Sequence, residues 1–272
     1  MLQSNVTTVI NCAANVKHFS KPAQIKVDNV TSVDNMISFC GDKISLAHIS
    51  TLSIAGFKGR STIDTVYDEN CLWIKQIFNN NPYLISKFNA EKHILSCICN
   101  SGLKAKIFRL GNIMPRQSDG VFQRNASQNM FLNAFKSILN LGMITEDMLN
   151  LKVEFSPVDE CADSIVKLLS DNSSVIYHIL NNNEITIRKI ISIFEKFGYS
   201  FEIVSPYKFS NALNSLDDAY VKEYIMGTNL NKYSQKISLK ALKNSGFEWS
   251  ITDDNYIKNI IDLIKIENDE QI

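Results

Sequence analysis

Short apolar strands alternate with helices along the first half of the chain, and this alternation limits the possible architecture more than any other feature. Runs of β-branched residues predict strands at 6–10, 44–49 and 105–110. Apolar residues at helical spacing predict helices at about 22–40 and 82–102. Strands that are separated by helices usually pair in parallel, and strands this apolar are usually covered on both faces. The pattern therefore predicts a parallel α/β sheet.

The second half of the chain is expected to return to this sheet and to add further helices. Strands are predicted at 153–155 and 175–180, on either side of a helix at 158–169. Apart from these segments, the chain after residue 113 is rich in Asn and is mostly helical in pattern. We expect two parts that are interleaved along the chain: a sheet domain at 1–113 and 151–182, and a smaller, mostly helical region at 114–150 and 183–272.

Composition argues against several classes of function. Lys+Arg and Asp+Glu both total 28, so no strong field would attract nucleic acid or an anionic membrane. The six cysteines form no Cys-x-x-Cys pair and the four histidines match no zinc spacing, so we expect no metal site and no disulfide framework. No apolar stretch reaches the roughly 18 residues of a membrane span, and the N-terminus lacks the pattern of a signal peptide. We expect a soluble, cytoplasmic protein.

Tyr83 and Lys87 lie four residues apart in the predicted helix at 82–102, so both side chains project from one face. A free phenol has a pKa of about 10, and a nearby ammonium lowers it. Such a pair suits acid/base work in carbonyl reduction. The bare spacing carries little weight, because an isolated pair of this kind is more often a surface Tyr beside a solvated Lys.

The surroundings of the pair make it a stronger candidate. Ser50 and Thr51 close one predicted strand, Asn11 to Ala14 close another, and Gly111 to Ile113 follow a third. Asn29 lies on the helix between the first two strands. Each residue alone has an ordinary structural explanation as packing, surface amide or turn. Parallel sheets bind ligands at the carboxyl ends of their strands, so the joint order indicates one site at this edge.

Six segments of the chain resemble the extended short-chain dehydrogenases. Within that group they are most similar to the thioester reductase domains of non-ribosomal peptide synthetases and to the related carboxylic acid and fatty-acyl reductases. The resemblance covers about residues 6–200 and implies a Rossmann-type sheet. The segments are Val-Ile-Asn-Cys-Ala-Ala-Asn-Val (9–16), Val-Asp-Asn-Val (27–30), Ile-Ser-Thr-Leu-Ser-Ile-Ala-Gly (49–56), Pro-Tyr-Leu-Ile-Ser-Lys-Phe-Asn-Ala-Glu-Lys (82–92), Phe-Arg-Leu-Gly-Asn-Ile (108–113) and Phe-Ser-Pro-Val-Asp (155–159).

The resemblance implies a reductase that uses NADPH to release an acyl or peptidyl thioester from the phosphopantetheine arm of a carrier protein, as an aldehyde or an alcohol. It implies that Tyr83 protonates the developing oxyanion and that Thr51, five residues before Gly56, hydrogen-bonds the same oxygen. Lys87 would lower the pKa of Tyr83 and bind the nicotinamide ribose, and Asn29 would hold a water or backbone group in a proton relay. The residues expected to contact the cofactor are Ala13, Ala14, Asn15, Ser50, Tyr83, Lys87, Gly111, Asn112 and Ile113.

One departure from the family is large. The family begins with a Gly-x-x-Gly-x-x-Gly turn that receives the cofactor pyrophosphate, and none of the ten glycines here form that pattern. We therefore expect a partial Rossmann sheet that begins at the fourth strand of the family's fold. Such a truncated chain would have an unpaired strand edge and impaired or no activity alone. NADH stays open beside NADPH, because the segment that separates them would be missing.

Two alternatives remain. Another extended short-chain dehydrogenase, such as a nucleotide-sugar epimerase or dehydratase, would need a pocket for a sugar nucleotide, and the Asn-rich segment 114–150 offers no obvious one. A non-catalytic remnant that only docks a carrier or partner domain would agree with the missing glycine-rich turn. Cofactor binding would separate these alternatives from the reductase.

Overall fold

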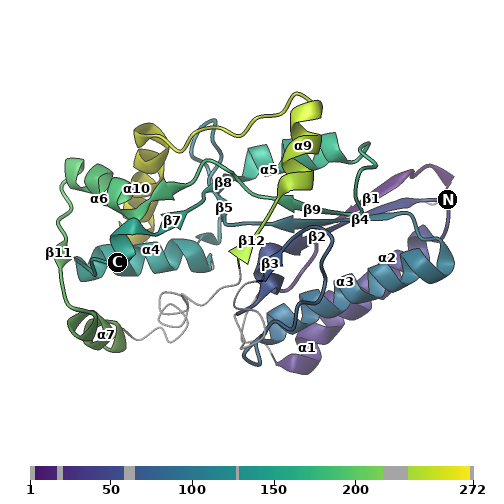
Figure 1. Ribbon diagram of the computed structural model, residues 1–272, viewed down its shortest axis with the longest axis horizontal. Coiled ribbons are helices and arrows are strands. Elements are labelled where there is room, and N and C mark those ends of the chain that lie inside the picture. Colours follow the sequence, from purple (N-terminus) through teal and green to yellow (C-terminus); the bar gives the residue numbers. More distant parts are fainter. Residues whose placement is uncertain (1–3, 17–20, 58–64, 127–128, 217–231, 270–272) are drawn as a thin grey trace. The chain divides into compact units, whose positions relative to one another are not determined.

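The computed structural model describes residues 4–16, 21–57, 65–126, 129–216 and 232–269 (Figure 1). Its largest sheet has four parallel strands in the order β1-β2-β4-β9. The strands are β1 (Thr8–Asn11), β2 (Ser45–Thr51), β4 (Ala105–Leu110) and β9 (Ile176–Ile179). The parallel α/β sheet that the alternation of elements predicts is thus confirmed.

Three helices and a π-helical turn lie together on one side of this sheet (Figure 1). The predicted helix at 22–40 is continuous but is built as α1 (Pro22–Lys26), the π-helical turn η2 (Val27–Thr31) and α2 (Ser32–Cys40). The other helix is α3 (Pro82–Ser101), which ends at Gly102 in the left-handed conformation with φ +67°. A π-helical turn is uncommon and often marks a functional site, so η2 points to a site near residues 27–31.

The sheet face beneath α3 changes character along the strands. Toward the amino ends, Leu46 and Ile107 pack with Ala90 and Ile94 of α3 in an apolar cluster. Side chains alternate along a strand, so His48 and Ser50 share this face with Leu46. Both are buried, as is Arg109, whose Cα is paired with that of Ser50. The apolar end anchors α3, and the polar end lies at the carboxyl edge where a site is predicted.

The chain divides into two compact units whose boundaries differ from the predicted ones. The first unit is Met1–Gly111, Asp163–Ile179 and Asn229–Glu248, and the second is Asn112–Ala162, Leu180–Thr228 and Trp249–Ile272. Segment 229–248 joins the first unit because β12 (Lys232–Tyr233) pairs with β3 (Val66–Tyr67), while α9 (Lys236–Asn244) contacts β9.

The predicted return of residues 153–155 to the main sheet is wrong. Here β7 (Lys152–Val153) pairs with β10 (Ile185–Thr186), and β8 (Ser156–Pro157) pairs with β5 (Ile113–Met114), so neither strand joins the four-stranded sheet. Phe155, between β7 and β8, is fully buried in an aromatic cluster. Burial of this ring within the second unit explains why the segment stays there.

The second unit is organised around that apolar cluster. Phe155 contacts Phe131 and Phe135 of α4 (Met130–Leu141) edge-on, and Phe135 contacts Phe194 of α6 (Ile187–Lys196). Thr186 caps α6 by accepting a hydrogen bond from the Lys189 N–H. The other α-helices in the described ranges are α5 (Val158–Leu168), α7 (Pro206–Asn214) and α10 (Asp254–Asp269). The short strands β6 (Met143–Ile144) and β11 (Glu202–Ile203) pair with each other, and η3 (Leu52–Ala55) and η5 (Met148–Asn150) are short 3-10 helices.

None of the helices in the described ranges combines the length and the apolar character that crossing a bilayer would require.

Candidate active site

The start of α3 is fixed by its preceding residues, and this places Tyr83. Asn79 and Asn80 adopt positive φ angles of 46° and 56°, which asparagine tolerates better than most residues. The Asn81 side chain then accepts hydrogen bonds from the backbone N–H groups of Tyr83 and Leu84 at 3.0 and 3.2 Å. Pro82 occupies the first turn of the helix, a position that proline favours. Tyr83 therefore occupies the buried first turn.

The loop after β2 is fastened to the segment before α3. Phe57 and Ile77 exchange backbone hydrogen bonds of 2.9 and 3.2 Å. Gly56 has φ +64°, and a Cβ there would lie 2.7 Å from the Ile77 carbonyl oxygen, so only glycine fits. This close approach connects the segment that begins at Thr51 with the segment that ends at Tyr83.

Thr51 and Tyr83 are brought together by this arrangement. Their side chains form a hydrogen bond, and Thr51 also accepts a hydrogen bond from the Ser53 N–H at 3.1 Å. Burial raises the pKa of Tyr83 to about 12, against the smaller lowering effect of the Thr51 hydrogen bond. The sequence predicts a lowered pKa, which is wrong for this structure because removal of the phenol from water outweighs the other effects.

Lys87 lies one turn further along α3 and is buried. Its ammonium donates a hydrogen bond of 2.8 Å to the Ile49 carbonyl oxygen in β2. Burial lowers the pKa of Lys87 to about 8, while Glu91 and Cys12 raise it. Lys87 therefore lies under the end of the strand that carries Thr51, with an ionisation midpoint close to neutral pH.

Asn29 makes two side-chain hydrogen bonds to the backbone of Asn15. Its side-chain oxygen accepts a hydrogen bond from the Asn15 N–H at 2.6 Å, and its side-chain nitrogen donates to the Asn15 carbonyl oxygen at 2.9 Å. The same nitrogen donates to the Ser86 hydroxyl at 2.9 Å. Because Asn29 lies in the π-helical turn η2, the irregular helix holds the segment after β1 against α3.

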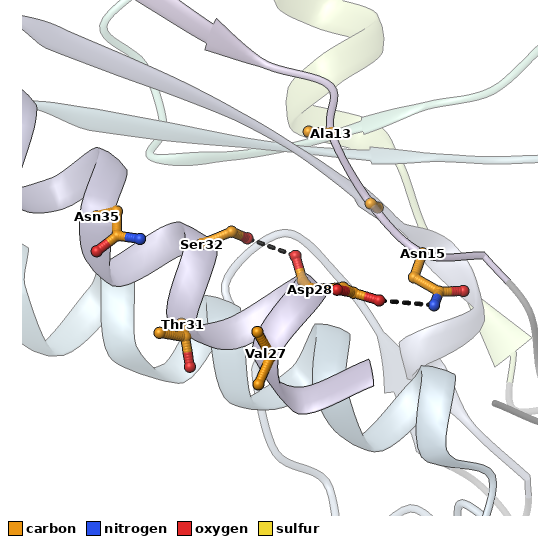
Figure 2. Close-up of a pocket in the computed structure, with 8 residues that line it drawn as sticks. Ala13, Asn15, Val27, Asp28, Thr31, Ser32 and Asn35 are labelled. Atoms are coloured by element: carbon orange, nitrogen blue, oxygen red, sulfur yellow. Dashed lines mark hydrogen bonds between the residues drawn. The ribbon is translucent and has the colours of Figure 1, made fainter. Parts of the chain in front are cut away.

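A cavity of about 520 Å³ lies beside this segment (Figure 2). Figure 2 shows Ala13 and Asn15 on the chain that leaves β1, across from Asp28 and Ser32 on the helix. The Asn15 side chain donates a hydrogen bond of 2.8 Å to the Asp28 carboxylate. The full lining is Ala13, Ala14, Asn15, Val27, Asp28, Thr31, Ser32 and Asn35.

This cavity suits the flat and hydroxylated parts of a nucleotide cofactor. Ala13 and Ala14 have small side chains that let a ring approach the backbone, and Asp28, Thr31 and Ser32 supply polar groups for sugar hydroxyls. The chain offers no glycine-rich turn for a pyrophosphate, so the fit covers only part of such a molecule. Within the described residues no cluster of His, Cys, Asp and Glu could hold a metal ion.

The remaining predicted cofactor contacts fall in different places. Ser50 is buried on β2, on the opposite side of the strand from Thr51. Gly111 follows β4 and donates to the Ile179 carbonyl oxygen at 2.9 Å. Asn112 and Ile113 belong to the second unit, where the Asn112 N–H donates to Glu154 at 2.5 Å. The first unit alone therefore brings together Thr51, Tyr83, Lys87, Asn29, Asn15, Ala13 and Ala14.

Three buried polar residues near the site escape the sequence prediction. Ser86 joins Asn29 to α3, and Glu91 and Arg109 form an ion pair of 2.8 Å beneath the helix. Two signals were present in the sequence. Arg109 interrupts an apolar strand, and a buried charge needs a partner, while Glu91 lies four residues after Lys87 on the same helix.

The chain matches a known protein family and is similar to solved structures. The family described as male sterility protein, an NAD-binding domain family, matches residues 1–165. The structure of a thiolation-reductase di-domain from an archaeal non-ribosomal peptide synthetase is 31% identical with a TM-score of 0.86, over 98% of this chain and 59% of that one. The search of curated protein sequences found none that matches this chain.

Two further structures share the fold at lower identity. The reductase domain of the aureusimine biosynthetic cluster is 24% identical with a TM-score of 0.83, over 96% of this chain and 69% of that one. UDP-glucuronic acid 4-epimerase from Bacillus cereus, in complex with UDP-glucuronic acid and NAD, is 17% identical with a TM-score of 0.62, over 97% of this chain and 77% of that one. At these identities the likeness concerns the fold alone.

Proposed function

Because the chain belongs to the male sterility protein family of NAD-binding domains, we propose that it is a nicotinamide-dependent reductase of carrier-bound thioesters. The observation that carries the proposal is the hydrogen-bonded pair of Thr51 and Tyr83, with Lys87 buried one turn away. The chain spans 59% of the thiolation-reductase structure, so the activity, substrate and partner are all part of this proposal.

Tyr83 is the proton donor in this proposal. With a pKa of about 12, its phenol keeps its proton across the neutral range and can deliver it to a carbonyl oxygen as negative charge develops there. The Thr51 hydroxyl lies within hydrogen-bonding reach of the phenol, so a carbonyl oxygen placed between them would receive two donors. Together the two hydroxyls would favour the oxyanion over the starting carbonyl.

Lys87 and the segment after β1 serve the cofactor. When bound, NADPH would supply the hydride that reduces the thioester carbonyl. Lys87 would bind the nicotinamide ribose through its ammonium, and Ala13 and Ala14 would leave space for the flat ring. Asn29 would keep Asn15 in place through the paired hydrogen bonds to its backbone. NADPH is proposed over NADH on the family resemblance alone.

A carrier protein with a phosphopantetheine arm is the proposed partner. The support is the similarity to an archaeal thiolation-reductase di-domain, which exceeds that to the epimerase in identity, 31% against 17%, and in TM-score, 0.86 against 0.62. A thioester is also consistent with the site, since two hydroxyl donors suit an oxyanion that forms on an acyl carbon. After hydride and proton transfer to the carbonyl, the pantetheine thiol would leave on its carrier and the acyl group would be released as an aldehyde. A second hydride, from another NADPH, would give an alcohol.

The test is NADPH oxidation, followed by absorbance, with an acyl-pantetheine thioester as substrate. We expect slow thioester-dependent oxidation by the wild-type chain at millimolar NADPH, because the chain offers no glycine-rich turn for the pyrophosphate. Tyr83→Phe should lose at least about 100-fold in kcat, the usual scale for removing a general acid. Thr51→Val should lose about as much as other removed oxyanion donors, again roughly 100-fold in kcat.

Cofactor binding, measured by fluorescence titration, is the control. Tyr83→Phe should bind NADPH as the wild type does, because the ring and its packing stay. If the wild type binds NADPH and never oxidises it with any thioester, the proposed reaction is wrong. If UDP-sugars rather than thioesters are converted, the epimerase alternative holds instead.

A further inference from the structure

A complete ion pair lies buried beneath the site. The Arg109 guanidinium donates to both carboxylate oxygens of Glu91, at 3.0 and 2.8 Å to one oxygen and 3.2 Å to the other. Neither side chain is exposed to solvent. Arg109 also lies 4.6 Å from the centre of the Tyr67 ring and donates to His178 at 3.1 Å. The carboxylate is thus held in one orientation by a guanidinium that is itself fixed on several sides.

Lys87 and Glu91 lie four residues apart on α3, so they share one face of the helix, toward the sheet. Glu91 acts electrostatically on Lys87 and favours its charged form. The Lys87 ammonium reaches the Ile49 carbonyl oxygen on β2, and Arg109 approaches from the neighbouring strand β4. Glu91 therefore pairs directly with the Arg109 guanidinium and also acts electrostatically on the Lys87 ammonium one turn earlier on α3.

Stability alone is a weak reason to keep such a pair. Removing two charges from water costs several kcal/mol each, and apolar residues of similar volume often serve as well or better. The apolar end of the same sheet face, with Leu46, Ile94 and Ile107, shows that this fold packs α3 without charges. A buried carboxylate one turn from a buried lysine has a more specific use.

We propose that Glu91, held by Arg109, is a positioning residue that keeps the Lys87 ammonium charged and directed at the end of β2. This inference rests on the proposed function, because Lys87 has a role only if the site binds a cofactor. A charged ammonium is the form that donates hydrogen bonds to ribose hydroxyls. Without Glu91, burial would favour the neutral amine, which is a poorer donor.

Other titratable groups surround Lys87, Glu91 and Arg109. Cys12, after β1, and His48, on β2, interact electrostatically with Lys87. Burial and the neighbouring Lys87 lower the pKa of His48 to about 3, so His48 is neutral near pH 7. Around Arg109 and Glu91 the titratable groups are Tyr67, Cys71, His178 and Asp68.

The test is a pH titration of the Lys87 side-chain nitrogen by NMR, with lysine labelled at Nζ and the signal assigned by its loss in Lys87→Arg. In the wild type the midpoint should lie near pH 8. In Glu91→Gln it should fall by about one unit, a tenfold change in the proton dissociation constant, because an adjacent opposite charge is removed. A midpoint within about 0.3 units of the wild type would overturn the inference, since measured shifts from such neighbours are about one unit or more.

Glu91→Gln leaves Arg109 without a counter-charge and could fail to fold. The double variant Glu91→Gln, Arg109→Gln removes both charges and should show the same downward shift of Lys87. Asp163→Asn is the matched control, because Asp163 faces Lys167 at the same four-residue spacing on an exposed helix surface. In Asp163→Asn the Lys87 midpoint should stay at its wild-type value.

The two proposals fail separately. If no thioester is reduced but the Lys87 midpoint falls in both Glu91 variants, the electrostatic inference stands and the proposed reaction fails. If thioesters are reduced and the midpoint does not move, the reaction stands and Glu91 is only structural. If Glu91→Gln binds NADPH more weakly at pH values above its Lys87 midpoint, and Asp163→Asn does not, the charge of Lys87 matters for cofactor binding and the two proposals are connected.

Discussion

Glu91 in the first unit and Glu154 in the second are both buried carboxyl groups, but they have different partners. Glu91 faces a guanidinium, with three N–H···O contacts to Arg109. Glu154 has neutral donors: the Asn112 N–H and the Ser156 hydroxyl, each at 2.5 Å. Burial raises the pKa of Glu154 to about 7, and those hydrogen bonds only partly oppose the shift.

The difference shows what hydrogen bonds and charges each do in a protein interior. Neutral donors fix the position of the Glu154 carboxyl but leave its charge dependent on pH. A guanidinium stabilises the carboxylate itself, so Glu91 can exert a steady electric effect on Lys87. The first unit therefore contains a fixed charge beside the candidate site, and the second contains a carboxyl that titrates near pH 7.

The largest expected effect comes from breaking the ion pair. Arg109→Met leaves the buried Glu91 carboxylate without its hydrogen-bonded counter-charge and should lower the free energy of unfolding by about 3–5 kcal/mol. Urea denaturation measures this. Arg116→Met, which removes an exposed pair with Asp119, should change the free energy by less than about 1 kcal/mol. If both variants lose the same free energy of unfolding, the buried Arg109–Glu91 pair would be no more important for stability than the exposed Arg116–Asp119 pair.

Glu154→Gln should remove a pH dependence. The folded-state pKa of about 7 exceeds the ordinary value of 4.5, so the neutral carboxyl stabilises the fold below pH 4.5, and this contribution is lost as pH rises through 7. Over that window the wild type should lose about 3 kcal/mol relative to the variant, from a shift of roughly 2.5 units. Denaturation at several pH values measures the difference. Parallel curves for the two proteins would contradict it.

Ser156→Ala should give a smaller and more specific change. The hydroxyl donates to Glu154 and also accepts from the Asn181 N–H at 3.0 Å, so its loss should cost about 1–2 kcal/mol. Because that hydroxyl favours the charged carboxylate, the pKa of Glu154 should rise further. The pH window of stability loss would then move upward in denaturation curves. A window that stays in place would show that Ser156 does not act on the charge.

Sequence reasoning located much of the first unit. The strand at 105–110 and the helix at 82–102 lie where predicted, because local spacing of apolar residues determines them. The position of Thr51 at the carboxyl edge of the sheet follows from the order of strands and helices in a parallel sheet. Such features depend on short-range rules that a single sequence displays.

Other features depend on three-dimensional packing and could not be read from the sequence. The π-helical turn at Asn29 is decided by hydrogen bonds to Asn15 and Ser86, which are distant in sequence. The raised pKa of Tyr83 depends on how deeply the ring is buried. Segment 151–162 belongs to the second unit, where β8 pairs with β5, and segment 229–248 belongs to the first, where β12 pairs with β3. These pairings join residues that are distant in sequence.

The most direct measurement of the central claim follows the reducing hydrogen. NADPH that carries deuterium at its transferable position would be mixed at millimolar concentration with the chain and an acyl-pantetheine thioester, and the product analysed by mass spectrometry. We expect an aldehyde with one deuterium on its carbonyl carbon, formed at least about 100-fold more slowly by Tyr83→Phe than by the wild type. Bound NADPH without any deuterated aldehyde or alcohol would contradict it.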